Sequence, residues 1–236
     1  MDEMNIPRFD LPRVVILGGG FAGLKEHRLV KDPKAFGPQE NNDGSWPGLG
    51  NFVYLADARF MPHGETHMHS HHEIDVISII VDGKISHEGS LEHGKDLERN
   101  DVQVQRAGGE GFSHNEINPD DTWNRLLQLW VLPEVAGAPA GYKVYKPVKN
   151  ELTRIYGGAT SGVGNSHADF PAETNIDVAL LSADQEISFD KSFLAYLTRG
   201  NGIANSEPVE EGDLIRGDAI TFKANNDVLL VIVHKG

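Results

Sequence analysis

Residues 62–72 read Pro62-His63-Gly64-Glu65-Thr66-His67-Met68-His69-Ser70-His71-His72 and hold five of the chain's eleven histidines. Three of these histidines, His67, His69 and His71, recur with a period of two. On a β-strand this period places side chains on one face of the sheet. Two neighbouring imidazoles on such a face can bind the same metal ion.

The residues that follow favour a buried strand over a solvated, histidine-rich loop. The run Glu73-Ile74-Asp75-Val76-Ile77-Ser78-Ile79-Ile80-Val81-Asp82-Gly83 is rich in β-branched residues and stops at an Asp-Gly turn signal. A second pattern, Gly111-Phe112-Ser113-His114-Asn115-Glu116, again places a histidine and a carboxylate on one strand face. A histidine-rich loop alone would not explain this second pair.

Together the two patterns predict a metal centre. They can supply three imidazoles and one carboxylate, which leaves one or two positions of an octahedral ion open. This ligand set suits iron, manganese, nickel, copper or zinc, and a histidine–carboxylate site with open positions favours Fe(II). The spacing alone permits either His67 and His69 or His69 and His71 as the first pair.

The motifs around these residues resemble the pirins, a family of bicupins. The resemblance rests on the stretches His69-Ser70-His71 through Asp82-Gly83, Ile85-Ser86-His87-Glu88-Gly89-Ser90, Arg106–Glu116, Asn118-Pro119 and Leu127–Pro133. The order of these motifs fits the family from about residue 50 onward.

This resemblance implies a particular ligand set. In the family pattern the first histidine pair lies a fixed distance before the turn glycine, and counting back from Gly83 reaches His69 and His71. The implied metal ligands are then His69, His71, His114 and Glu116, with His67 beside them. The chain departs from the family in one respect: the residue between the paired histidines is usually proline, and here it is Met68 or Ser70, depending on which pair is the first.

Two further residues have family counterparts. The equivalent of Asp75 is a glutamate that faces the metal cavity, so Asp75 is expected either beside the metal ligands or as a carboxylate at the water-exposed rim. His87 matches a family histidine, for which we expect a hydrogen-bonded structural role. By default Trp123 and Trp130 are ordinary β-sheet aromatics, and His63 and His72 are expected at the surface or rim.

The composition indicates an all-β protein, and the resemblance implies two antiparallel β-barrels of the cupin or jelly-roll type. With 26 glycines, 12 prolines and many short β-branched runs, the chain has the turn density of such folds. We expect residues 1–50 to form an N-terminal extension packed on the barrels. Residues 51–135 would form the metal-binding cupin, and residues 136–236 a second cupin without a metal site. Small residues and proline between Val135 and Gly141 mark the boundary.

An internal repeat is consistent with a duplicated barrel. Asp96–Asp101 and Asp213–Asp218 both read D-L-x-R-x-D, and each is followed by an alternating strand. The histidines are not repeated, because the second copy runs on through Asn225–Leu230.

A competing motif lies near the N-terminus. The run Arg13–Leu24 contains G-x-G-x-x-G after a short apolar strand, as in dinucleotide-binding proteins. That motif needs a helix under the pyrophosphate, and Lys25–Asp32 is too short for a packed crossover helix before Pro33. We therefore expect an N-terminal strand and a glycine turn laid on the first barrel.

Charge and composition exclude several other classes of protein. A formal net charge of −14 argues against a nucleic-acid partner, which would require a basic patch. The absence of cysteine excludes disulfides, thiolate catalysis and cysteine-ligated metals. No apolar run approaches the roughly 18 residues that a membrane helix needs, so we expect a cytoplasmic protein without a membrane partner.

The resemblance implies two classes of function. The favoured one is an oxidoreductase of the quercetin 2,3-dioxygenase type, which would open a flavonol-like aromatic substrate with O₂ while Glu116 takes the 3-hydroxyl proton. The alternative is a non-enzymatic, metal-dependent regulatory protein that binds a partner protein. A third option is an unrelated small-molecule cupin activity, such as sugar isomerisation.

Overall fold

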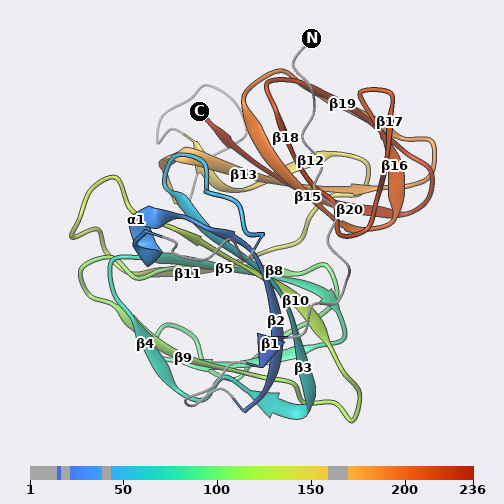
Figure 1. Ribbon diagram of the computed structural model, residues 1–236. Helices are drawn as coiled ribbons and strands as arrows, with labels where there is room; N and C mark the ends of the chain where they lie inside the picture. The colour runs from blue at the N-terminus through green and yellow to red at the C-terminus, as the bar shows by residue number, and fades with distance from the viewer. Residues whose placement is uncertain (1–14, 17–21, 39–43, 159–169) are drawn as a thin grey trace. The chain divides into compact units, whose positions relative to one another are not determined.

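A computed structural model describes residues 15–16, 22–38, 44–158 and 170–236, which divide into two compact units (Figure 1). One unit is Arg13–Lys146, and the other contains Pro147–Gly236. The regular structure is antiparallel β-sheet throughout, apart from one short helix in the described residues, α1 (Pro33–Phe36). The predicted all-β bicupin fold is confirmed.

The first unit is a strongly curled sheet. Its strands are β1 (Val15–Ile16), β2 (Ala22–Lys31), β3 (Phe52–Glu65), β4 (His69–His71), β5 (Asp75–Asp82), β6 (Ile85–Gly89), β7 (Lys95–Leu97), β8 (Val102–Arg106), β9 (Phe112–Ile117), β10 (Arg125–Val131) and β11 (Gly141–Tyr145). The main path runs β11-β8-β5-β10-β3-β9-β6-β7, with β2 also paired to β3 and β4 to β9. The β-branched run predicted as a strand is β5, which is buried from Asp75 to Val81 and lies between β8 and β10.

The second unit is a sandwich of two sheets. Its strands are β12 (Leu152–Gly158), β13 (Ala172–Leu181), β14 (Glu186–Phe189), β15 (Phe193–Arg199), β16 (Asn201–Ala204), β17 (Glu207–Glu210), β18 (Leu214–Gly217), β19 (Ile220–Ala224) and β20 (Val228–Lys235). One sheet has the order β12-β13-β20-β15-β18 and the other β14-β19-β16-β17. Alternate apolar residues from both sheets, such as Phe222 of β19 and Leu230 of β20, form one buried core.

The same type of hydrogen-bonded turn occurs once in each of the two units. In the first unit Asp101 Oδ2 accepts from the Glu98 amide at 3.0 Å, and the Asp101 amide donates to the Glu98 carbonyl at 2.9 Å. In the second unit Asp213 and Glu210 make the same two hydrogen bonds at 2.9 and 3.0 Å. The repeat is therefore real, but its predicted register is wrong, because Asp101 corresponds to Asp213 and not to Asp218.

The predicted register is wrong because the feature that the two units have in common is a turn conformation and not the D-L-x-R-x-D sequence motif. Each aspartate follows a residue with positive φ, Asn100 at 71° and Gly212 at 96°. The same turn docks on the preceding long strand in both units, because the amides of Ile80 and Leu197 donate to the two aspartate carbonyls at 3.0 Å.

With the two turns aligned, the strand pairing identifies the position in the second unit that corresponds to Glu116. In the first unit His87 of β6 lies opposite Glu116 of β9, and in the second Ala204 of β16 lies opposite Phe222 of β19. Phe222 thus stands where Glu116 stands, and Ile220 where His114 stands. Both are buried in the apolar core, and neither carries a metal-ligating atom.

The N-terminal segment adds a full strand to the first sheet. The glycine run Gly18–Gly20 lies outside the described residues, but β2 follows it and pairs antiparallel with β3, where a dinucleotide-binding fold would need a helix. At the other end of the unit, β11 pairs with β8, so the first unit extends past residue 135 to Lys146. In the described parts of the chain, no helix is long and apolar enough to span a membrane.

Candidate metal centre

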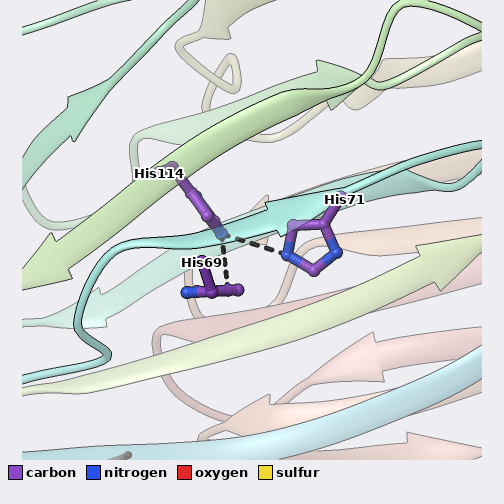
Figure 2. A group of neighbouring side chains, drawn as sticks. All are labelled: His69, His71 and His114. Atoms are coloured by element: carbon purple, nitrogen blue, oxygen red, sulfur yellow. Dashed lines mark hydrogen bonds between the residues drawn. The ribbon is translucent and has the colours of Figure 1, made fainter.

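Strands β4 and β9 bring three histidines together. Their antiparallel register places His69 directly opposite His114 and His71 opposite Phe112. One ligand atom from each of His69, His71 and His114 lies within 4.8 Å of the other two. Figure 2 shows the three imidazoles pointing toward one another.

A glycine holds the two strands at this distance. Gly111 precedes β9 and has a φ of 72°, and a Cβ atom there would lie only 2.8 Å from the His71 carbonyl oxygen. Only glycine satisfies both constraints, so Gly111 allows β9 to approach β4 closely enough for the imidazoles to meet.

The three Nε2 atoms converge at distances that fit a metal ion. His114 Nε2 lies 3.0 Å from His69 Nε2 and 3.2 Å from His71 Nε2. Two imidazole nitrogens bound at about 2.1 Å to one ion with an angle near 90° would be about 3.0 Å apart. The side chains present therefore fit a divalent metal held by three imidazoles.

Burial keeps two of these rings neutral. The pKa of His71 is lowered to about 4, first by burial and then by the neighbouring His69. Burial also lowers the pKa of His114 well below its ordinary value, and His69, His71 and His87 add to the shift. Neutral imidazoles retain a lone pair on one ring nitrogen, which a metal ligand requires.

One of the three tautomers is fixed by the backbone. His69 Nδ1 lies 2.9 Å from the His67 carbonyl oxygen, which can only accept, so Nδ1 carries the proton and Nε2 carries the lone pair. The His67 side chain is exposed, and its Nδ1 lies 3.5 Å from Glu65. Of the two pairs that the spacing permitted, the structure brings His69 and His71 together with His114, and His67 contributes a carbonyl oxygen beside them.

Glu116 is fully buried but stands outside the group of three histidines. Its Oε1 accepts hydrogen bonds from Ser78 Oγ at 2.7 Å and Gln103 Nε2 at 2.6 Å, and its Oε2 accepts from Gln128 Nε2 at 3.1 Å. Burial raises the pKa of Glu116, while these hydrogen bonds and the nearby His69 oppose the rise. The carboxylate is thus held rigidly in a site where a nearby positive charge would stabilise its ionised form.

A cavity of about 300 Å³ joins Glu116 to His69 and His71. Its walls come mainly from alternate residues of three neighbouring strands, namely Leu24, Glu26 and Arg28 of β2, Tyr54, Ala58 and Phe60 of β3, and Leu126, Gln128 and Trp130 of β10. Most of these side chains are apolar, and Tyr54 stacks on Trp130 with ring centroids 4.4 Å apart. Trp130, treated by default as an ordinary sheet aromatic, therefore forms part of the cavity wall.

The polar residues of β2 that line the cavity were not among the site residues predicted from the sequence. Glu26 accepts a hydrogen bond from Tyr54 Oη at 3.0 Å and also binds Arg28 Nε. The Arg28 side chain is about one-third exposed, at 35%. The period-two alternation of Leu24, Glu26 and Arg28 is typical of a strand. The glycine run before it and the loop residues after it do not favour a strand, so the sequence did not predict one here.

Two predicted residues behave differently in the structure. Asp75 is buried and accepts from Arg106 Nε at 2.9 Å, so it is neither exposed at a rim nor part of the cavity wall. His87 is fully buried, yet neither ring nitrogen has a hydrogen-bond partner in the described chain, so its predicted hydrogen-bonded role is wrong. Packing decided both outcomes: Arg106 is opposite Asp75 on β8, and the His87 ring is enclosed beside His114 and Tyr142.

The surface histidines lie as expected. His63 is exposed and pairs with Asp121 at 2.7 Å, and His72 Nε2 lies 3.0 Å from the Gly109 carbonyl oxygen. Trp123 is also exposed, with the Lys25 ammonium 4.8 Å from its ring centroid.

Comparison with known proteins agrees with the motifs. A curated relative from Zymomonas mobilis, named "Putative quercetin 2,3-dioxygenase", is 28% identical over 189 residues, which cover 76% of this chain and 80% of the relative. A "Pirin-like protein" from Caulobacter vibrioides is 29% identical over 176 residues, covering 70% and 75% of the two chains.

Solved structures share the fold at lower identity. The bacterial pirin YhhW from Escherichia coli in complex with nickel(II) superposes with a TM-score of 0.78 at 15% identity, covering 99% of each chain. A quercetin 2,3-dioxygenase from Acinetobacter baumannii gives a TM-score of 0.67 at 16% identity, covering 98% of this chain and 86% of the other. Residues 36–131, which carry all three clustered histidines and Glu116, match the Pirin family model. The resemblance to the pirins first seen in the motifs is therefore confirmed, and residues 36–131 of the first unit carry the match to that family.

Proposed function

We propose that the protein is a metal-dependent dioxygenase of the quercetin 2,3-dioxygenase type, acting on a flavonol-like aromatic compound. The observation that carries the proposal is the cavity itself, in which two of the three clustered histidines and the buried carboxylate of Glu116 face a largely apolar space. The names of the curated relatives and the nickel(II) in the related pirin structure support the same assignment.

The proposed ligands are His69, His71, His114 and Glu116, and Fe(II) is the proposed metal among Fe, Mn, Ni, Cu and Zn. A bound divalent ion would supply a Lewis acid with open positions for a substrate oxygen and O₂. The cavity of about 300 Å³ would hold a planar aromatic molecule against the stacked rings of Tyr54 and Trp130.

Glu116 has the chemistry of a general base as well as that of a ligand. It is buried, faces the cavity and lies near His69, so it can take the proton of the substrate 3-hydroxyl. Hydrogen bonds from Ser78, Gln103 and Gln128 hold its carboxylate in one orientation and stabilise its ionised form. The apolar walls exclude water around this proton transfer.

The test combines metal analysis with oxygen consumption. The purified protein, loaded anaerobically with Fe(II), should carry about one metal per chain and consume quercetin or a related flavonol only when O₂ is admitted, with equal uptake of both. Glu116→Gln retains a coordinating amide oxygen but cannot accept a proton, so it should keep part of its metal and lose at least about 100-fold in kcat.

Replacing the partly buried Glu65 by Gln in the same assay controls for the loss of one charge near the site. If the iron-loaded wild type consumes no flavonol but binds a protein partner only when metal is present, the regulatory function replaces the enzymatic one.

A further inference from the structure

The carboxamide of Gln105 lies directly behind His114. Gln105 is on β8 and is fully buried, and its Nε2 is 3.2 Å from His114 Nδ1. Its other polar atom, Oε1, is buried without a hydrogen-bond partner among the described residues. The amide nitrogen of this side chain therefore has a hydrogen-bond partner, and the amide oxygen has none among the described residues.

This orientation places a proton where a metal ion would bind. When the Gln105 amide donates to His114 Nδ1, the neutral imidazole must carry its proton on Nε2. That nitrogen faces His69 Nε2 at 3.0 Å and His71 Nε2 at 3.2 Å. Because His69 already has its proton on Nδ1, its Nε2 can accept, and the three rings form a consistent metal-free network.

A metal held by all three rings needs the opposite tautomer of His114. Its Nε2 must lose the proton and Nδ1 must gain one, and an amide NH₂ cannot accept from that Nδ1–H. A half-turn of the Gln105 carboxamide exchanges its two ends, which have almost the same shape, and presents Oε1 as the acceptor.

We propose that Gln105 is a positioning residue that turns its carboxamide when metal binds, from donor to acceptor toward His114 Nδ1, and so selects the His114 tautomer. The inference rests on the metal site of the proposed function. It assigns to the buried, unpartnered Oε1 a role that is taken up only in the metal-bound state.

The neighbouring glutamine on β8 shows the contrast. Gln103 uses both ends, because its Nε2 donates to Glu116 Oε1 at 2.6 Å and its Oε1 accepts from Tyr142 Oη at 3.2 Å. Turning Gln103 would break both hydrogen bonds, whereas turning Gln105 costs one and gains another. Strand β8 thus provides a fixed carboxamide behind Glu116 and a reversible one behind His114.

Imidazole NMR of the ¹⁵N-labelled full chain, with and without Zn(II) as a diamagnetic probe, tests the proposal. In the wild type the His114 proton should be on Nε2 without zinc and on Nδ1 with it. Gln105→Met, which has neither donor nor acceptor, should weaken zinc binding by roughly 10- to 100-fold in a chelator competition assay.

Gln105→Glu is the matched variant, because a carboxylate can only accept. It should place the His114 proton on Nδ1 even without zinc and bind zinc at least as tightly as the wild type. A merely structural role for Gln105 would change thermal stability in both variants without moving the tautomer.

The proposal is overturned if the metal-free wild type already has its His114 proton on Nδ1, or if Gln105→Met binds zinc as tightly as the wild type. In those cases the metal site and the proposed function remain intact. If instead the wild type binds no zinc at the histidines, the metal site of the proposed function fails and this inference fails with it.

Discussion

His69 and His71 present their rings from β4, whereas His114 presents its ring from β9 and is the most deeply buried of the three. The histidines of β4 lie two residues apart, so their shared face follows from strand geometry alone. His67 lies two residues earlier but has a φ of 58°, which takes it out of the extended conformation. This single left-handed residue turns the His67 side chain away and aims its carbonyl oxygen at His69.

Alanine substitutions at the two outer histidines should therefore have unequal effects. His71→Ala removes a nitrogen from the cluster and should abolish stoichiometric metal binding, because an incomplete ligand set cannot hold the ion. His67→Ala keeps the carbonyl group and should weaken binding by less than the roughly 10-fold that loss of a hydrogen bond to a ligand costs. Inductively coupled plasma analysis and metal titration measure both, and the opposite ranking would assign His67 as the ligand.

At the scale of elements, the site depends on two close strand contacts, β9 with β4 and β2 with β3, and each contact has its own structural cause. Gly111 lets β9 come close to β4, and the pairing of β2 with β3 carries Glu26 and Arg28 to the cavity. The contribution of each contact can be tested by a substitution there and a matched substitution elsewhere in the same unit.

Gly111→Ala should lower metal affinity, and Gly94→Ala should not. Both glycines have positive φ, 72° and 68°, so alanine costs about 1–2 kcal/mol of backbone strain at either position. A Cβ at Gly94 meets nothing within 4 Å, whereas one at Gly111 lies 2.8 Å from the His71 carbonyl oxygen and must displace it. Thermal unfolding and metal titration of both variants separate the two effects, and equal metal affinity in the two would contradict this role for Gly111.

Arg28→Met should weaken substrate binding without slowing the chemical step. Arg28 faces the cavity, and a hydrogen bond from a charged group contributes about 1.5–3 kcal/mol, which corresponds to a rise in KM of roughly 10-fold or more. Lys25→Met is the control, because Lys25 is on the other face of β2 against Trp123. Steady-state kinetics with a flavonol measure the difference, and identical KM values for the two variants would exclude a binding role for Arg28.

At the scale of the whole molecule, the formal net charge of −14 reflects many carboxylates. The pH dependence of the free energy of unfolding therefore tests which carboxylates are stabilised in the folded state. In the second unit Asp177 links three strands, because it accepts from Arg154 Nε at 2.6 Å and lies 2.9 Å from His234 Nε2. Burial alone would raise its pKa, but the hydrogen bonds from His234 and Arg154 outweigh burial and lower the pKa below its ordinary value of 3.8.

The sign of this shift fixes the pH dependence. A carboxylate whose pKa is lower in the folded state stabilises the fold above its unfolded pKa, and the stabilisation is lost as the pH falls through the folded pKa. Asp177→Asn should therefore destabilise the protein at pH 7, and the deficit should shrink below pH 3.8. Urea unfolding of the wild type and the variant at several pH values measures this, and a deficit that is constant down to pH 2 would contradict it.

The sequence by itself determined the class of fold and the candidate residues of the metal site. Strands and candidate ligands follow from the period-two histidines, the β-branched run from Glu73 to Val81 and the pair His114 and Glu116, because the alternation of side chains along a strand is a local property. The family motifs add the choice of His69 and His71 over His67. The repeat was also visible, but its register was not, because a turn is defined by its hydrogen bonds and backbone angles.

Only the tertiary structure decided which residues surround those candidate ligands. The contact of His69 with His114 joins positions 45 residues apart through strand register, and the hydrogen bond of Tyr54 to Glu26 joins positions 28 residues apart. The partners of Gln105, the isolation of His87 and the pairing of Asp75 with Arg106 likewise depend on sheet closure. Local propensity specifies strands and their faces, but closure of a sheet sets which faces meet, and that information is distributed over the whole chain.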